Sequence, residues 1–236
     1  MSLLPKLNNM PKYLVDVPSM KKDINIRPFL VKEEKIMLIA MESQDGKQIA
    51  QAVLDTVKSC ILDEINVNSL TSYDVEYLFL KIRSKSVGET AKLLFKCESC
   101  NDENEVIVKL DDIKIDVKNA DNVIKINDTI SVEMKHPSFI SLANSEDVIT
   151  ESPTRQIFGL IKESIISVMT EDERIDMREV KFEEFEEFME SMTGDQFTKI
   201  REYIQDIPKL KHDIEYKCKA CEHENKISVE GLQSFL

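Results

Sequence analysis

The sequence predicts an α+β protein, in which a helical N-terminal unit is followed by a unit closed by two similar cysteine-containing hairpins. Two observations support this prediction. Several segments carry apolar residues at helical spacing, which indicates amphipathic helices. Around two C-x-x-C motifs, apolar residues instead alternate with polar ones, which indicates strands. Helices and strands that are grouped separately along a chain are typical of α+β proteins.

Composition disfavours several classes of protein. The 44 acidic residues against 31 basic ones give a formal net charge of -13, which repels phosphate groups and argues against binding to nucleic acid or to anionic membranes. No apolar run reaches about 18 residues, so we expect no membrane span. Only 5 glycines and no tryptophan argue against an enzyme with a glycine-rich nucleotide loop. The N-terminus does not resemble a secretory signal, and we therefore expect a reducing cytoplasm.

We expect three parts along the chain. Residues 1–23 contain three prolines and no periodic pattern, so they are expected to form a loose arm. The residues of the arm that are available to a neighbouring protein are Leu3, Leu4, Tyr13, Leu14 and Val15. Residues 24–90 form the helical unit. Residues 91–236 form the unit with the two cysteine motifs, and a helical insertion is expected within it at about 138–208.

The helical unit contains two clear helix signals. Residues 24–41 begin as an extended segment and continue as an apolar strand or helix. An amphipathic helix is expected over 46–62. A second helix should begin at Thr71, because the T-x-x-D sequence that ends at Asp74 is able to form a capping box, and it should end near Gly88.

The rest of the chain divides into a strand-rich and a helix-rich stretch. Alternating apolar residues predict short strands at 105–110, 113–117, 123–126 and 130–134. The Asn127-Asp128 step between the last two suits a hairpin turn. Helical spacing then predicts helices at 156–169, 182–192 and 195–207, and Pro208 ends the last of them.

Four of the five cysteines belong to two copies of one pattern. Each copy has an aromatic residue and a lysine before C-x-x-C, and Glu-Asn with two alternating β-branched residues after it. The copies span 95–110 and 216–230, and their cysteines are Cys97, Cys100, Cys218 and Cys221. Two thiolates from each of two such turns complete the tetrahedral shell of structural zinc, with Zn–S distances of about 2.3 Å. The sequence therefore predicts a zinc-ribbon-like unit, whose two motifs bracket a β-hairpin and the helical insertion.

A closed four-thiolate shell leaves no position for water, so we expect this Zn²⁺ to be structural. A thioredoxin-like redox pair is less favoured, because such a pair opens a helix and both motifs here are followed by strand-like sequence. His223 is near enough in sequence to be an alternative ligand, but four thiolates suffice. Cys60 lies on an apolar helical face and is expected to be an inert core residue. The sequence contains no P-loop, G-x-S-x-G or H-E-x-x-H motif, and we expect no enzymatic activity.

A zinc-ribbon regulator that binds nucleic acid is the alternative function. Lysines lie near both motifs, but neighbouring acidic residues offset them, and no aromatic residues are interleaved with the lysines. The strongest local charge is acidic, since residues 171–190 carry ten acidic residues against three basic ones. This segment is either the solvated side of helices or an acidic docking surface for a basic partner.

Two longer segments are distinctive, IRPFLVKEEKIMLIAMES at 26–43 and YDVEYLFLKIRSKSVGE at 73–89. They resemble the baseplate hub subunit and hub-assembly chaperone family of T-even-like contractile-tailed bacteriophages. The resemblance continues through the motif at Cys97 and Cys100, and more weakly through residues 134–138.

The resemblance implies a non-enzymatic role in building the baseplate hub, either as a hub component or as a chaperone that leaves after assembly. The implied partners are other hub and tail proteins, with an oligomer within the hub compatible with that role. The implied location is the host cytoplasm during assembly, and the virion tail baseplate for a retained component. From the residues we expect the helix at 75–82 and the turn at 83–89 to form the docking surface for hub proteins.

Overall fold

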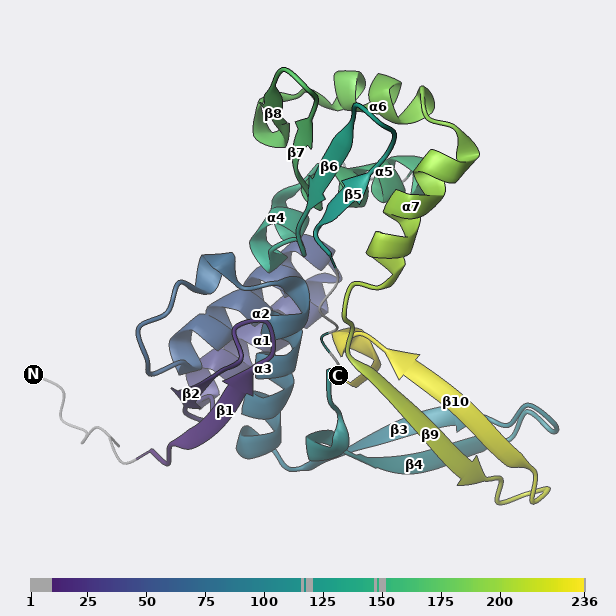
Figure 1. Cartoon of the computed structure of the whole chain (residues 1–236). Helices are drawn as coiled ribbons and strands as arrows, with labels where there is room; N and C mark the ends of the chain where they lie inside the picture. The colour runs from purple at the N-terminus through teal and green to yellow at the C-terminus, as the bar shows by residue number, and fades with distance from the viewer. Residues whose placement is uncertain (1–9, 116, 118–120, 147, 149–151, 236) are drawn as a thin grey trace, which may run out of the picture. The chain divides into compact units, whose positions relative to one another are not determined.

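The computed structural model describes residues 10–115, 117, 121–146, 148 and 152–235 (Figure 1). The chain forms two compact units. Unit 1 contains the described residues of 1–65, 74–115 and 210–236, and unit 2 contains those of 66–73 and 116–209. Unit 1 thus includes chain on both sides of residue 90, the boundary that the sequence predicted. The mixture of helices with small antiparallel sheets confirms the α+β class. Each helix within the described residues is too short or too polar to span a bilayer.

Unit 1 begins with a hairpin of β1 (Tyr13–Val17) and β2 (Lys22–Ile26). The expectation of a loose arm up to residue 23 is therefore wrong from Tyr13 onward. The physical reason is the alternation of the two strands, which places Val17, Ile24 and Ile26 in the core. Of the residues expected to be available in the arm, Leu3 and Leu4 lie outside the described residues, and Tyr13, Leu14 and Val15 are part of β1.

Helices α1 (Val31–Ser43) and α2 (Gly46–Cys60) follow the hairpin. The helix predicted over 46–62 is confirmed as α2, whose first turn is capped because the Asp45 carboxylate accepts hydrogen bonds from the backbone N–H groups of Lys47 and Gln48. A 3-10 turn, η1 (Val67–Ser69), precedes the next helix.

Helix α3 (Ser72–Ser86) confirms the second helix signal. Of the expected docking surface, the turn at 83–89 includes exposed residues and stays a prediction, whereas the part on the helix at 75–82 is wrong. Val75, Leu78 and Ile82 have no exposed surface, because α3 is apolar on more than one side and lies within the core. Side chains that are already buried in the folded chain present no surface to another protein.

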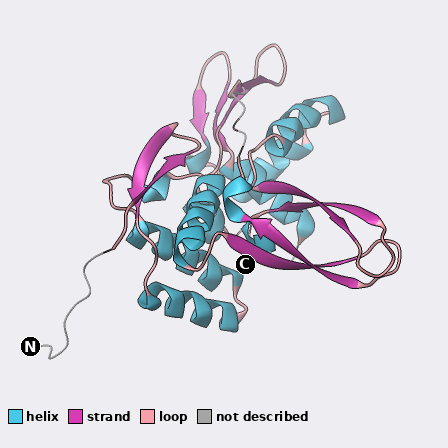
Figure 2. Cartoon of the chain, turned by 90° about the horizontal axis from the view of Figure 1, so that it is seen from below, coloured by secondary structure: helices cyan, strands magenta, loops and turns pink. Residues whose placement is uncertain are grey.

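Two similar hairpins complete unit 1. The first pairs β3 (Thr90–Lys96) with β4 (Glu103–Lys109), and the second pairs β9 (Lys211–Lys217) with β10 (Glu224–Glu230). Both views show them side by side (Figures 1 and 2), and we call the pair the finger. The strand expected at 113–117 is reduced, in its described part, to an isolated bridge between Lys114 and Lys211. The 3-10 turns η2 (Leu110–Asp112) and η4 (Leu232–Phe235) follow the two hairpins.

Unit 2 is built on an antiparallel sheet in the order β5-β6-β7-β8. The strands are β5 (Val123–Lys125), β6 (Ser131–Met134), β7 (Ile165–Met169) and β8 (Arg174–Asp176). The predicted hairpin turn between β5 and β6 is confirmed, and Asn127 Oδ1 accepts hydrogen bonds there from the backbone N–H groups of Thr129 and Ile130.

The helices of unit 2 are α4 (Phe139–Asn144), α5 (Pro153–Glu163), α6 (Phe182–Glu190) and α7 (Gly194–Gln205), and the 3-10 turn η3 (Met177–Glu179) precedes α6. The helix predicted over 156–169 is wrong after residue 163. Its apolar C-terminal part is strand β7, which pairs with β6 and β8 in the centre of the sheet. Phe185 and Met189 of α6 are buried whereas most of its glutamates are exposed, which agrees with both predictions for the acidic segment, a solvated face and a docking surface.

Candidate metal centre

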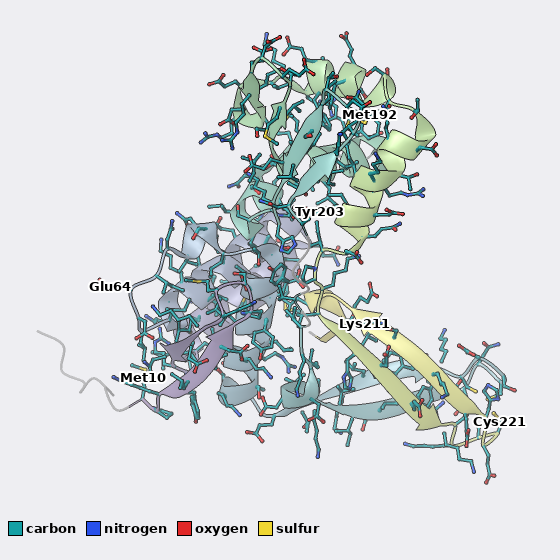
Figure 3. All side chains as sticks on the ribbon, viewed as in Figure 1. Met10, Glu64, Met192, Tyr203, Lys211 and Cys221 are labelled. Carbon is teal, nitrogen blue, oxygen red and sulfur yellow. The ribbon has the colours of Figure 1, made fainter. Side chains whose placement is uncertain are left out.

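The four predicted ligands meet at the end of the finger. Their sulfur atoms all lie within 4.8 Å of one another. The Sγ atoms of Cys97 and Cys221 are 3.7 Å apart, as are those of Cys100 and Cys218, and each of these pairs joins the two hairpins. A tetrahedron with Zn–S distances of 2.3 Å has edges of roughly 3.8 Å. The cluster therefore fits a tetrahedral, thiolate-ligated metal ion. Figure 3 labels Cys221 at this end of the finger and Lys211 at the other end.

Both cysteine turns have the same backbone conformation. In the first, the Cys97 N–H donates to the Asp102 carbonyl at 2.9 Å, and Asn101 has a left-handed φ of 60°. In the second, the Cys218 N–H donates to the His223 carbonyl at 2.9 Å, and Glu222 has the same φ. This tight turn brings the two cysteines of each motif to one side, so that each hairpin presents two sulfur atoms. The His223 side chain is exposed and is not part of the cluster.

Two buried asparagines connect the hairpins, and their role was not predicted from the sequence. Asn104 of β4 donates from Nδ2 to Cys218 Sγ at 3.5 Å, and Asn225 of β10 donates to Cys97 Sγ at 3.6 Å. Each is 1% exposed. Their Oδ1 atoms accept hydrogen bonds across the same gap, from the backbone N–H groups of Lys219 at 2.9 Å and Glu98 at 3.0 Å. The Glu-Asn pair that follows both C-x-x-C motifs is the sequence signal from which a shared role of these asparagines could have been predicted.

An aromatic pair packs beside the cluster. The rings of Phe95 and Tyr216, which occupy equivalent positions in the two motifs, are stacked with centroids 6.1 Å apart. The Tyr216 hydroxyl donates to the Lys96 carbonyl at 3.2 Å. The repeated aromatic residue before each C-x-x-C therefore holds the hairpins together close to the ligands.

The surroundings favour ionised sulfur at two positions. Backbone N–H groups, with that of Cys221 contributing most, lower the pKa of Cys218 to about 6. Desolvation opposes ionisation of Cys97, but N–H donors from Cys100, Ser99 and Asn225 outweigh it and lower its pKa. Contacts with the other three sulfur atoms outweigh the N–H of Asp102 and raise the pKa of Cys100 to about 12. Negative charge on one sulfur thus opposes charge on the next, and a cation among them would remove that conflict.

Cys60 behaves differently from the other four. It is fully buried in α2, and desolvation raises its pKa to about 11. Its position confirms the prediction of a core residue.

Asn104→Asp is expected to weaken metal binding by about 10–100-fold, because the variant replaces an N–H donor to Cys218 with a carboxylate that repels the thiolate. Competition with a chromogenic chelator measures the affinity. Asn225→Asp makes the reciprocal change at Cys97 and should have an effect of similar size. Unchanged affinity in both variants would show that the asparagines do not support the ligands.

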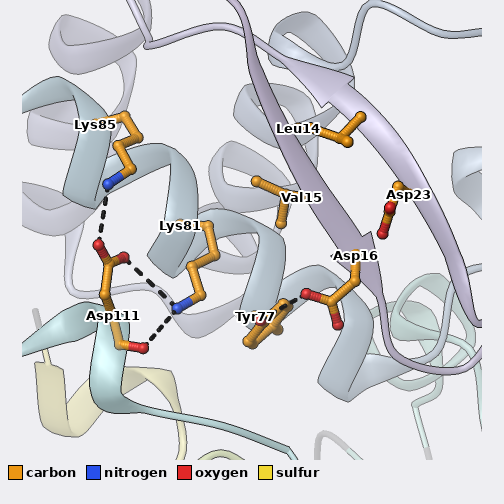
Figure 4. Close-up of a pocket in the computed structure, with 8 residues that line it drawn as sticks. All are labelled: Leu14, Val15, Asp16, Asp23, Tyr77, Lys81, Lys85 and Asp111. Atoms are coloured by element: carbon orange, nitrogen blue, oxygen red, sulfur yellow. Dashed lines mark hydrogen bonds and ion pairs between the residues drawn. The ribbon is translucent and has the colours of Figure 1, made fainter.

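A pocket of about 320 Å³ lies elsewhere in unit 1, between the β1–β2 hairpin and α3 (Figure 4). Several of its charged groups are already paired. Asp111 accepts from Lys85 at 3.0 Å and lies 3.6 Å from Lys81, while the Tyr77 hydroxyl donates to Asp16 at 3.0 Å. These contacts attach α3 to the neighbouring segments, so we interpret the polar groups of the pocket as structural and not as a ligand site.

Comparison with known proteins identifies one family. Residues 10–236 match the model of the T4 bacteriophage base plate protein family. No curated protein and no solved structure matches the chain. The match covers nearly all of the residues that form both units, including the four cysteines. This chain therefore belongs to the T4 bacteriophage base plate protein family, whose members are structural proteins of the phage tail baseplate and act with other baseplate proteins.

Proposed function

We propose that this protein is a non-enzymatic component or assembly chaperone of the baseplate hub, and that it binds one structural Zn²⁺ through Cys97, Cys100, Cys218 and Cys221. The observation that carries this proposal is the four-cysteine cluster at the end of the finger, in a chain of the base plate family. The protein would act in the host cytoplasm during assembly, and a retained hub component would remain in the tail.

The metal ligands close a long loop of the chain. Cys100 and Cys218 are 118 positions apart, and all of unit 2 except residues 66–73 lies between them. Joining chain positions this far apart removes more conformational freedom from the unfolded chain than joining near ones. Zinc bound there would supply binding free energy to the folded finger. Four thiolates leave no position for a substrate, which supports a non-catalytic role.

The surface of the finger favours a protein partner over nucleic acid. Several of its lysines are paired with acidic residues: Lys92 with Glu105 at 3.1 Å, Lys217 with Glu222 at 3.3 Å and Lys226 with Glu215 at 2.7 Å. Paired lysines attract phosphate less than a continuous basic stripe does.

One face of the finger carries unpartnered apolar side chains. Leu94 and Ile107 are 70% and 62% exposed, and the β3–β4 register places them diagonally on one side of the hairpin. The equivalent positions of the second hairpin are Glu215 and Ser228. The two hairpins share their ligands, asparagines and aromatic residues but differ at these outward positions. Because the fold does not require apolar residues there, we assign this face to contact with a baseplate hub protein.

Leu94→Glu combined with Ile107→Ser gives the first hairpin the outward residues of the second. We expect this variant to fold and to retain its metal, because the second hairpin already carries these residues. Its affinity for hub proteins should fall by at least about tenfold, since burying an exposed leucine side chain is worth about 1.5–3 kcal/mol. Co-purification with hub proteins from assembling phage measures the loss, and Asp213→Asn on the second hairpin is the control. Unchanged co-purification would contradict the assignment of this face.

Mass spectrometry of mature particles, beside that of assembly intermediates, separates the two hub roles. A hub component is present in both, whereas a chaperone is present only in the intermediates. Binding to DNA with strong salt dependence would instead support the alternative nucleic-acid function.

A further inference from the structure

Helix α1 is apolar on its outward side as well as its inward side. Met37 and Ala40 are buried, but Val31, Leu38 and Ile39 are 79%, 56% and 54% exposed. A helix with apolar residues all around is usually buried on all sides. Contiguous exposed apolar side chains mark a surface that is covered in the assembled protein.

The outward stripe of α1 carries charges as well as apolar residues. Val31, Lys35, Leu38, Ile39 and Glu42 lie at positions i, i+4, i+7, i+8 and i+11, and therefore on one side of the helix. Neither Lys35 nor Glu42 makes an ion pair with any residue that the structure describes. The two charges are placed symmetrically, each about 5 Å along the axis from the midpoint between Leu38 and Ile39.

We propose that a second copy of this chain packs antiparallel against α1. A twofold axis at the midpoint between Leu38 and Ile39 brings Lys35 of each copy opposite Glu42 of the other. The same axis gathers Leu38 and Ile39 of both copies into one apolar cluster. Each side then presents the same surface to the other, as an isologous dimer requires.

The charge pattern selects this arrangement. In a parallel pair in register, Lys35 would face Lys35 and Glu42 would face Glu42, and like charges across an interface are unfavourable. In the antiparallel pair both contacts are attractive. The order of charges along one helix is thus complementary to itself only when the second helix runs in the opposite direction.

Charge exchange tests the proposal in the full chain. Sedimentation velocity over a range of concentrations should show a dimer for the unaltered protein. Lys35→Glu and Glu42→Lys should each weaken it by at least about tenfold, because each creates two like-charge contacts. An equimolar mixture of the two variants should restore the dimer, since a stripe with two acidic side chains then faces a stripe with two basic ones. The double variant Lys35→Glu/Glu42→Lys should also dimerise.

Controls separate this result from a loss of folding. Both single variants change exposed residues, and their recovery on mixing shows directly that each is folded. Lys58→Glu on the exposed side of α2 changes the net charge by the same amount as Lys35→Glu and should leave the dimer intact. A monomer at every concentration, or a dimer that neither single variant weakens, would overturn the proposal. So would failure of the mixture to associate. Loss of hub co-purification in Leu38→Glu, from a protein that stays monomeric, would assign α1 to a baseplate partner instead.

Discussion

Cys218→Ser is expected to remove the metal and to destabilise the finger. Cys218 provides the sulfur with the pKa of about 6 and lies at the centre of the contacts between the hairpins. Metal content should fall from about one ion per chain to none, because three thiolates no longer close a tetrahedral site. A metal present at about 100 times its dissociation constant stabilises the folded state by about 2.7 kcal/mol. Hydrogen-exchange protection of the finger should therefore fall by about 100-fold.

Cys60→Ser is the matched control. It removes a thiol from the core of α2, where the sulfur is fully buried and is not part of the cluster. It should retain the metal while losing about 1–3 kcal/mol of stability, because the new hydroxyl is buried. A chelator should reproduce the Cys218→Ser result in the unaltered protein. A finger whose protection is the same with and without metal would contradict a structural role for the ion.

The cluster of four cysteines was predictable because the cysteines belong to two copies of one sequence motif. Two motifs with matching flanks indicate two matching turns, and two thiolates from each complete one known coordination shell. The role of Asn104 and Asn225 was less accessible. Their repetition is visible in the sequence, but only the packing of the hairpins shows that each donates to a cysteine of the other motif.

Tertiary contacts explain the elements that were missed. The apolar residues of 165–169 fit helical spacing and strand spacing about equally well, and pairing with β6 and β8 decides between them. The β1–β2 turn uses Lys21 at a φ of 49°, a position at which glycine would be the usual signal. For α3, apolar residues suggested a binding surface, but the rest of unit 1 already covers them.

Arg27→Met is expected to destabilise unit 1 by about 3–5 kcal/mol at neutral pH. Arg27 and Glu33 form an ion pair of 2.9 Å between side chains that are 8% and 4% exposed. Glu33 also accepts a hydrogen bond from the Leu30 N–H at 2.8 Å and thereby secures the first turn of α1. Without Arg27 the carboxylate stays buried with one remaining partner cation, Lys32, which is largely solvated and compensates little.

The pH dependence of this effect has a definite sign. Burial alone would raise the pKa of Glu33, but the hydrogen bonds from Arg27 and Leu30 outweigh it, and the pKa is lowered from 4.5. A lowered pKa stabilises the folded protein above pH 4.5, and that contribution is lost as pH falls through the folded value. In Arg27→Met, burial dominates and should raise the pKa of Glu33. Protonation of Glu33 then removes the uncompensated charge and reduces the loss of stability in the variant as the pH falls.

The difference in stability between the two proteins should therefore narrow between about pH 7 and about pH 4. Urea unfolding at both pH values measures this difference, with tyrosine fluorescence as the probe. The double variant Arg27→Met/Glu33→Gln removes both charges and should be more stable than Arg27→Met alone at neutral pH, because no uncompensated carboxylate remains. Two results would show that the ion pair does not hold α1 in place. One is a difference in unfolding free energy that stays constant with pH, and the other is a double variant whose loss of stability equals the sum of the two single losses.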